Sequence, residues 1–121
     1  MQLELLQDRF CVCKMDSVSQ VNMQSDFFFL AKTDSETSLV CKEEDAPKEC
    51  AAVDKVWRGF RIVGALDFSL VGILADISAL LAKAGVPIFA VSTYDTDYIL
   101  VKEQYIDKAL TALKDGAYSL M

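Results

Sequence analysis

The sequence predicts an α+β fold in which helices pack on one face of an antiparallel sheet. Short segments alternate apolar and polar residues, as half-buried strands do, and two longer segments repeat apolar residues every three to four positions, as amphipathic helices do. Of the 121 residues, 53% are hydrophobic and 25% are charged, which is typical of a globular chain. Part of the pattern also recurs after 60 residues, which indicates that one small unit occurs twice.

The N-terminal half predicts strands and loops without a full helix. The run Phe27-Phe28-Phe29-Leu30-Ala31 is too apolar to be half exposed, so we expect a central strand there. The polar turn after it favours a hairpin. In order, the expected elements are an extended segment over 5–14, a loop over 16–26, strands over 27–31 and 38–41, and a charged loop over 42–50.

The C-terminal half predicts two helices between strands. Ile73, Ile77 and Leu81 recur at the spacing of a core-facing helical stripe, and Gly85 is well placed to end that helix. A second stripe of this kind comes after a predicted hairpin. In order, the expected elements are a strand over 56–66, a helix ending at Gly85, strands over 88–93 and 98–101, a helix over 103–114 and a short strand over 118–121.

The repeat predicts how these elements are grouped. The elements expected in the C-terminal half come in the ferredoxin-like βαββαβ order: strand, helix, strand, strand, helix and strand. We therefore expect a complete unit over residues 56–121 and a degenerate copy over 1–55, in which the segment for the first helix is too short. The identical pairs at this offset are Phe29 with Phe89, Thr33 with Thr93, Lys42 with Lys102, and Glu43 with Glu103.

Composition argues against several classes of function. The net charge of −6 repels phosphate backbones, so we expect no nucleic-acid partner. The chain has no histidine, hence no such general base, and no catalytic constellation stands out, so we expect neither an enzyme nor a cofactor. No run of about 18 apolar residues is present, so we expect no membrane partner. The first residues lack the basic start of a signal peptide, which favours the cytoplasm.

The four cysteines favour a structural interpretation. Cys11 and Cys13 lie two residues apart on an expected strand and therefore point the same way. Metal or redox use of this pair is an alternative, but Cys41 and Cys50 complete no known ligand spacing. We expect buried, reduced thiols and no metal site.

The turn into the first helix is the strongest candidate for a binding site. A helix start leaves backbone N–H groups without partners and carries partial positive charge, so a carboxylate is a natural ligand there. Asp67 or Asp97 could hold an ammonium group, and Gly72 would let a ligand approach the backbone. Together these groups suit a free α-amino acid. The alternative is that Asp67 or Ser69 caps the helix and Asp97 lies in solvent.

Two stretches, Leu66–Leu74 and Ile88–Val101, resemble the ACT domain, and more narrowly the CASTOR-type ACT family that includes the animal arginine sensors. The resemblance implies two tandem ACT-like units without an attached enzyme domain. It also implies that the loop entering the helix and an Asp opening the third strand contact the ligand. Carried over, the expected ligand-binding residues are Asp67, Phe68, Ser69, Leu70, Val71, Gly72 and Asp97, with Ser92 and Thr93 beside them.

The sequence therefore predicts a small regulatory sensor that binds a free amino acid at an interface between ACT units. Such an interface needs two faces, so we expect a homodimer, and the bound state could be passed to a regulated protein partner. At Thr37 the first copy lacks the acid that Asp97 supplies in the second, which indicates one type of site. The alternative is a non-catalytic protein-interaction module of ferredoxin-like fold without a small-molecule ligand.

Overall fold

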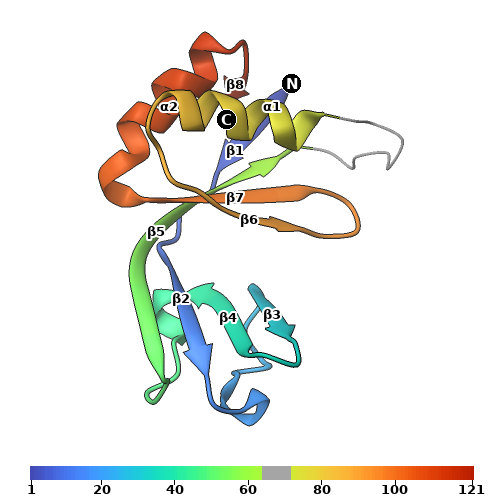
Figure 1. The fold of residues 1–121 in the computed structure, drawn as a ribbon, viewed down its shortest axis with the longest axis vertical. Helices are drawn as coiled ribbons and strands as arrows, with labels where there is room; N and C mark the ends of the chain where they lie inside the picture. Colours follow the sequence, from blue (N-terminus) through green and yellow to red (C-terminus); the bar gives the residue numbers. More distant parts are fainter. Residues whose placement is uncertain (64–71) are drawn as a thin grey trace. The chain divides into compact units, whose positions relative to one another are not determined.

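A computed structural model describes residues 1–63 and 72–121, which divide into two compact units (Figure 1). We call Met1–Gln7 with Arg58–Met121 the helical unit, and Asp8–Trp57 the cysteine unit. The division after Trp57 lies close to the boundary expected after residue 55. The first seven residues, however, group with the C-terminal part of the chain.

The helical unit is a mixed sheet with two α-helices. Strand β5 (Ala52–Ile62) enters it from the cysteine unit and pairs with β1 and β7, while β7 also pairs with β6 and β1 pairs in parallel with β8. Along the chain, β5, α1, β6, β7, α2 and β8 come in the predicted βαββαβ order, but β8 pairs with β1 and not with β5. The other elements are β1 (Gln2–Leu5), α1 (Ile73–Lys83), β6 (Phe89–Ser92), β7 (Asp97–Lys102), the 3₁₀ turn η3 (Glu103–Tyr105), α2 (Ile106–Asp115) and β8 (Ser119–Leu120).

Strand β1 explains why the N-terminus belongs to the helical unit. It runs antiparallel to β5 and occupies the position that the fourth strand takes in a βαββαβ sheet. Its Leu3, opposite Ile62, is fully buried. The extended segment expected over 5–14 covers most of β2 but only the last residue of β1, so the first strand was not predicted.

The core of the helical unit lies between the sheet and its helices. In Figure 1 both helices cover the same face of the sheet. Alternate strand residues meet the helical stripes there, and each fully buried large side chain contributes about 1.5–3 kcal/mol. The buried residues include Phe60 and Ile62 of β5, Ile99 and Val101 of β7, Ile77 and Leu81 of α1, and Leu113 of α2.

Two glycines shape the helix ends. Gly85 has a φ of +77°, the left-handed conformation that ends a helix without a Cβ penalty, so the predicted C-terminus of α1 is confirmed. Gly116 comes directly after α2, and a Cβ there would fall against the side chain of Leu80 on α1. The absence of a side chain at Gly116 therefore lets the two helices approach closely.

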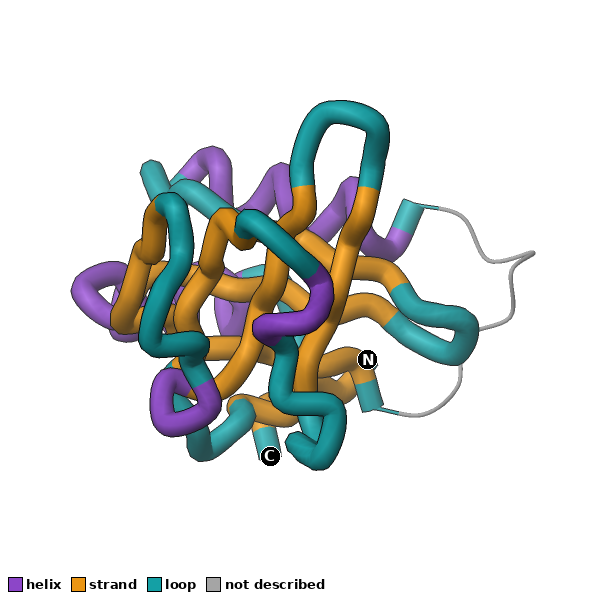
Figure 2. Tube along the Cα trace, turned by 90° about the horizontal axis from the view of Figure 1, so that it is seen from below, coloured by secondary structure: helices purple, strands orange, loops and turns teal. Residues whose placement is uncertain are grey.

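The cysteine unit contains strands, short turns and loops, which are visible in Figure 2. Its central strand is β4, which pairs with both β2 and β3, while β2 also pairs with the N-terminal part of β5. The predicted loop over 16–26 and the charged loop each contain one 3₁₀ turn. The elements are β2 (Phe10–Met15), η1 (Val18–Gln20), β3 (Phe28–Lys32), β4 (Thr37–Lys42) and η2 (Glu43–Asp45).

The expectation of a central strand over 27–31 is wrong. Among the described strands, β3 pairs with β4 alone and lies at the end of the strand order. The aromatic side chains are explained by local packing, because the Phe27 ring lies 5.1 Å from that of Phe10 and 5.3 Å from that of Phe29. These rings pack against one another instead of lying between two layers.

The β3–β4 and β6–β7 hairpins coincide at the 60-residue offset found in the sequence. Phe29 pairs with Val40, as Phe89 pairs with Leu100, and the remaining cross-strand pairs keep the same register. The Thr33 N–H donates to Glu36 O at 2.9 Å, and the Thr93 N–H donates to Thr96 O at 2.8 Å. The two hairpins are therefore the same structure, down to the bonds of their turns.

The units differ in the segment that comes after each hairpin. After η3, Ile106 continues in the helical conformation and α2 begins. After η2, Ala46 is extended, with ψ of 135°, and the next residue is Pro47. Since the residue before a proline is disfavoured in the helical region, the second helix cannot continue here. Within the described residues, no helix combines the length and the apolar character that crossing a membrane requires.

Candidate functional site

The turn between β6 and β7 holds three of the predicted site residues. The Ser92 hydroxyl donates a short hydrogen bond of 2.5 Å to the Asp97 carboxylate, and the two residues are cross-strand partners. The Thr93 hydroxyl donates to Thr96 O at 3.0 Å. The buried Thr96 hydroxyl in turn donates to Ile62 O at 3.0 Å, which ties the turn to the end of β5.

Asp97 lies on the helix-covered side of the sheet. It shares the strand parity of Ile99 and Val101, both of which pack in the core beneath α1 and α2. Unlike them it is only partly buried, because it opens the strand. Its carboxylate can therefore meet solvent or a ligand while Ser92 holds its orientation.

The start of α1 provides a second part of the candidate site. Gly72 is the N-cap, with φ of +85° and no side chain to cap the helix, and beyond its chain neighbours no atom of the described residues lies within 4 Å of the position a Cβ would take. The left-handed φ alone accounts for a glycine here. Asp76 in the first turn accepts a hydrogen bond of 2.5 Å from the Tyr118 hydroxyl. Burial, together with this bond, raises the pKa of Tyr118 to about 12.

The predicted residues divide into three groups. Ser92, Thr93 and Asp97 are brought together at the hairpin turn. In Figure 1, the start of α1 lies toward the same end of the helical unit as this turn, and Gly72 is the N-cap of that helix. The predicted residues of the turn itself, Asp67, Phe68, Ser69, Leu70 and Val71, lie outside the described residues.

An ion-pair network on the opposite face of the sheet was not anticipated. The Arg61 guanidinium donates to the Glu4 carboxylate at 2.8 Å and to the Tyr98 hydroxyl at 3.5 Å, and it lies over the Tyr98 ring. The bond to Tyr98 and then that to Glu4 raise the pKa of Arg61. Alternation within the strand places these residues away from the core. Arg61 and Glu4 are cross-strand partners of β5 and β1, so their ion pair joins these two strands on the face opposite Asp97.

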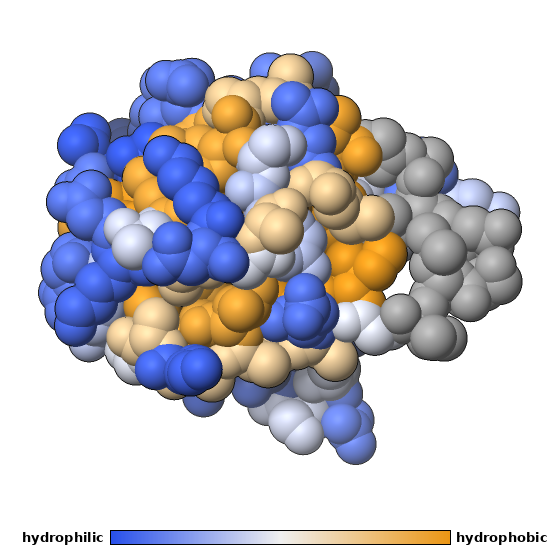
Figure 3. Space-filling model, turned by 90° about the horizontal axis from the view of Figure 1, so that it is seen from above, coloured by the Kyte–Doolittle hydropathy of each residue, from blue (hydrophilic) through white to orange (hydrophobic). Residues whose placement is uncertain are grey.

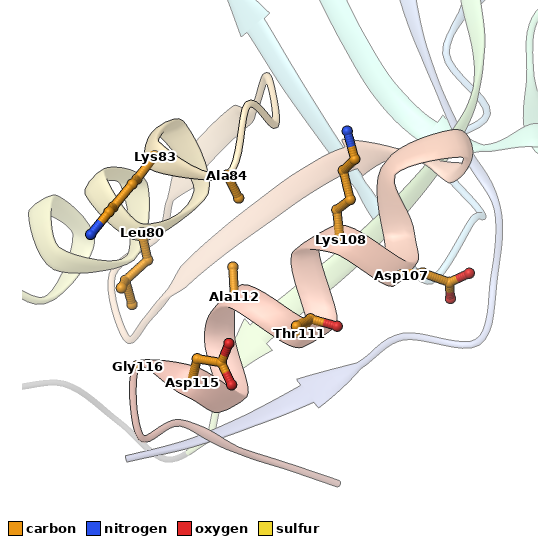
Figure 4. Close-up of a pocket in the computed structure, with 9 residues that line it drawn as sticks. All are labelled: Leu80, Lys83, Ala84, Asp107, Lys108, Thr111, Ala112, Asp115 and Gly116. Atoms are coloured by element: carbon orange, nitrogen blue, oxygen red, sulfur yellow. The ribbon is translucent and has the colours of Figure 1, made fainter.

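A groove lies between the two helices and has a volume of about 680 Å³ (Figure 4). Figure 3, which views the molecule from above, shows apolar patches between hydrophilic ones. Of the predicted site residues that the structure describes, Gly72, Ser92, Thr93 and Asp97, none lines the groove. Its lining comes from the second half of α1 and from α2: Leu80, Lys83, Ala84, Asp107, Lys108, Thr111, Ala112, Asp115 and Gly116.

The cysteine unit contains a cluster of thiols that sequence spacing did not reveal. The Cys11 Sγ lies 3.6 Å from the Sγ atoms of both Cys13 and Cys41, and all three residues are buried. Cys41 joins the pair because it is the cross-strand partner of Cys11. The expectation that Cys11 and Cys13 are buried and point the same way is confirmed. A hairpin register, once assigned, could have added Cys41.

The environment of the cluster favours neutral thiols. The Cys41 hydrogen bond and then burial strongly raise the pKa of Cys11. Burial, and after it the bond with Cys11, raises the pKa of Cys13 to about 12. The half-buried Cys50 packs against the same cluster.

Comparison with solved structures shows the fold. A protein from Agobacterium tumefaciens superposes with a TM-score of 0.87 at 27% identity, covering 99% of this chain and 91% of that one. A Vibrio cholerae protein of unknown function, called a possible transport protein, gives 0.70 at 20% identity over 96% and 89%. The regulatory subunit of aspartate kinase from Thermus thermophilus, in a ligand-free form, gives 0.67 at 14% identity over 94% and 95%.

Comparison with protein families shows the relationship. The model of the ACT domain matches residues 52–115, a range that includes β5, α1, the β6–β7 hairpin and α2. The match covers more than half of the sequence and contains all of the predicted site residues. The chain belongs to the ACT domain family.

Proposed function

We propose that this chain is a small, non-catalytic regulatory protein that binds a free amino acid at the hairpin end of the helical unit. The observation that carries the proposal is the placement of Asp97. A partly buried carboxylate, oriented by Ser92, opens β7 on the side of the sheet that α1 covers. It offers an anionic partner for an ammonium group near the end of the unit where α1 begins.

The other half of an α-amino acid needs hydrogen-bond donors. The first N–H groups of α1 lack intrahelical partners, and the helix dipole favours a carboxylate beside them. Gly72 carries no side chain at this helix start, and the Asp76 carboxylate in the first turn accepts a hydrogen bond from Tyr118. Asp67 to Val71 complete the proposed binding set, together with Ser92 and Thr93. Family membership and the likeness to an aspartate kinase regulatory subunit support a regulatory role.

The arrangement of units belongs to the same proposal. The cysteine unit is a degenerate ACT-like copy, supported by the equivalent hairpins, and residues 56–121 form the other ACT domain once β1 completes its sheet. The CASTOR-type resemblance favours a ligand bound between two ACT units. Since the first copy has Thr37 where the second has Asp97, a homodimer supplies the second face. We also propose that the protein is cytoplasmic and that it acts on a regulated protein partner.

A thermal-shift screen over the twenty amino acids tests the binding site. A ligand raises the melting temperature with its concentration because it binds only the folded state. Asp97→Asn should abolish the shift, while Asp95→Asn, which removes the same charge from the exposed turn, should retain it. If no amino acid stabilises the protein, or if Asp97→Asn responds as the parent does, the proposal fails. Light scattering at micromolar concentration checks the dimer, which a monomeric mass would contradict.

A second candidate function, a protein-interaction module without a small-molecule ligand, is favoured by the groove between α1 and α2. Its walls mix apolar and charged side chains, as interaction surfaces often do. Thr111→Arg would fill the groove from its exposed wall. If the groove holds a second copy, the Thr111→Arg variant should become monomeric. A dimer unaffected by Thr111→Arg removes the groove from consideration as the dimer contact.

A further inference from the structure

The thiol cluster of the cysteine unit has the geometry of a metal site. Two Sγ–Sγ distances are 3.6 Å, and all three Sγ atoms lie within 4.8 Å of one another. A point equidistant from three atoms so arranged lies about 2.0 to 2.4 Å from each, and a Zn–S bond is about 2.3 Å long. An ion could therefore contact Cys11, Cys13 and Cys41 without movement of the strands.

A fourth sulfur lies beside the three. Cys50 packs against the cluster, but its Sγ atom lies outside the group of three that are within 4.8 Å of one another, so it would join an ion by a shift of the loop that carries it. It is only half-buried, and its neighbours Glu49 and Ala51 are exposed, so an ion can reach the buried thiols along this side. The edge between sulfurs in a tetrahedral ZnS₄ site is about 3.8 Å, close to the separations observed.

We propose that Cys11, Cys13, Cys41 and Cys50 form a binding site for a thiophilic d¹⁰ cation, Zn²⁺ or Cu⁺. All-sulfur donor sets select such ions, and the chain has no histidine that could compete as a ligand. Four sulfurs suit tetrahedral Zn²⁺, whereas the three buried ones suit trigonal Cu⁺. Each thiol that binds as a thiolate releases one proton, so the Zn²⁺ site with four sulfurs releases four protons and involves no electron transfer.

The fold gives this site a structural purpose. The cysteine unit has about 50 residues and lacks the two helices that cover the sheet of the helical unit. Three of the six buried residues in its core cluster are cysteines; the others are Met15, Val21 and Leu39. Units of this size with a small apolar core are often stabilised by a metal or by disulfides. A bound cation would join β2, β4 and the loop after η2.

The experiment titrates the reduced, full-length protein anaerobically with Zn²⁺ against a chromophoric chelator, and separately with Cu⁺ against a Cu⁺ chelator. We expect one ion per chain, and with Zn²⁺ the release of four protons to an indicator dye. Cys41→Ser should weaken binding of either ion by more than about 100-fold, because it removes a direct ligand. Cys50→Ser should weaken Zn²⁺ far more than Cu⁺.

Val40→Ala is the matched control, since it changes a buried residue next to Cys41 whose side chain points to the other face of the same strand. It should lower stability but leave the stoichiometry and affinity unchanged. Native mass spectrometry of the parent, which depends on no variant, should retain one ion. If the reduced protein binds neither ion with a 1:1 stoichiometry, the proposal is overturned.

Discussion

The two units contain equivalent hairpins whose core faces pack against different elements. In the helical unit, α1 and α2 bury the core face of the hairpin, whereas in the cysteine unit turns, loops and thiols do so. The cross-strand pairs and the turn hydrogen bonds are the same in both. The comparison teaches that the hairpin is determined by its own sequence, and that the packing above it is free to change.

The largest expected effect comes from truncating equivalent core residues. Ile99 and Leu39 occupy the same place in the two hairpins, and at most 1% of either is exposed. Ile99→Ala should cost about 2–5 kcal/mol, because the two helices packed over this face of the sheet cannot fill the cavity. Leu39→Ala should fall toward the lower end of that range, since turns and loops can relax. Urea unfolding measures both losses of stability. An equal loss at Leu39 would show that the turns and loops packed against it are as rigid as the helices packed against Ile99.

The helix–helix contact of the helical unit gives the next largest effect. Gly116→Ala should cost about 1–3 kcal/mol, because the new methyl group would displace Leu80. Ala117, which has a φ of +74°, provides the control. Ala117→Gly removes a strained side chain from the next position and should stay within about 1 kcal/mol of the parent. Thermal unfolding checks both, and an undisturbed Gly116→Ala would mean that the two helices separate at little cost.

The pH dependence of the free energy of unfolding tests the thiol packing of the cysteine unit without a mutation in either core. The pKa of Cys13 is raised from 9.0 to about 12 and that of Cys11 is also raised, so folding favours their neutral forms. This contribution is complete below pH 9 and is lost as pH rises toward the folded pKa values. The metal-free protein should therefore lose stability above pH 9.

Two variants identify the origin of that loss. Cys11→Ala/Cys13→Ala should flatten the profile, although both side chains are small and buried. Tyr118→Phe should leave most of the loss in place, although the pKa of Tyr118 is also raised, to about 12. Urea midpoints between pH 8 and 11 measure the effect, and a profile that the cysteine variant leaves unchanged would contradict the assignment.

The smallest effect concerns the junction between the units. Val56 in β5 has a φ of +67°, an unfavourable conformation for a β-branched residue, and its N–H donates to the Glu43 carboxylate at 2.8 Å. Val56→Gly should stabilise the protein by up to about 1 kcal/mol, since the bond persists and the strain is relieved. Chemical denaturation checks this. A loss of stability would show that the valine side chain packs usefully despite its 41% exposure.

Much of the fold could be predicted from local patterns. The stripe of α1, its end at Gly85 and the β6–β7 hairpin could all be derived from spacing and turn residues, because these elements are determined by neighbours in sequence. The position of β3 at the edge of the strand order could not, since an apolar run has the same composition whether it is covered by a layer or by its own aromatic rings. Nor could the placement of β1 against β5, which depends on a contact between distant segments.

The candidate site shows the same division. Ser92 and Asp97 could be related from sequence, since a hairpin makes them partners. The bond from Thr96 to Ile62 could not, because it joins residues 34 positions apart. The thiol cluster lies between these cases: spacing along the chain related Cys11 to Cys13, but only strand pairing adds Cys41.

Strand β5 has a consequence for anyone who wishes to dissect the protein. Its first part pairs with β2 in the cysteine unit and its last part pairs with β1 in the helical unit. The N-terminus, meanwhile, contributes β1 to the unit formed by the end of the chain. A single cut at Trp57 would thus give a C-terminal fragment without one strand of its sheet, and an N-terminal fragment carrying that strand unpaired. The two units can be separated only if residues 1–7 are joined to the C-terminal fragment, as in a circular permutation.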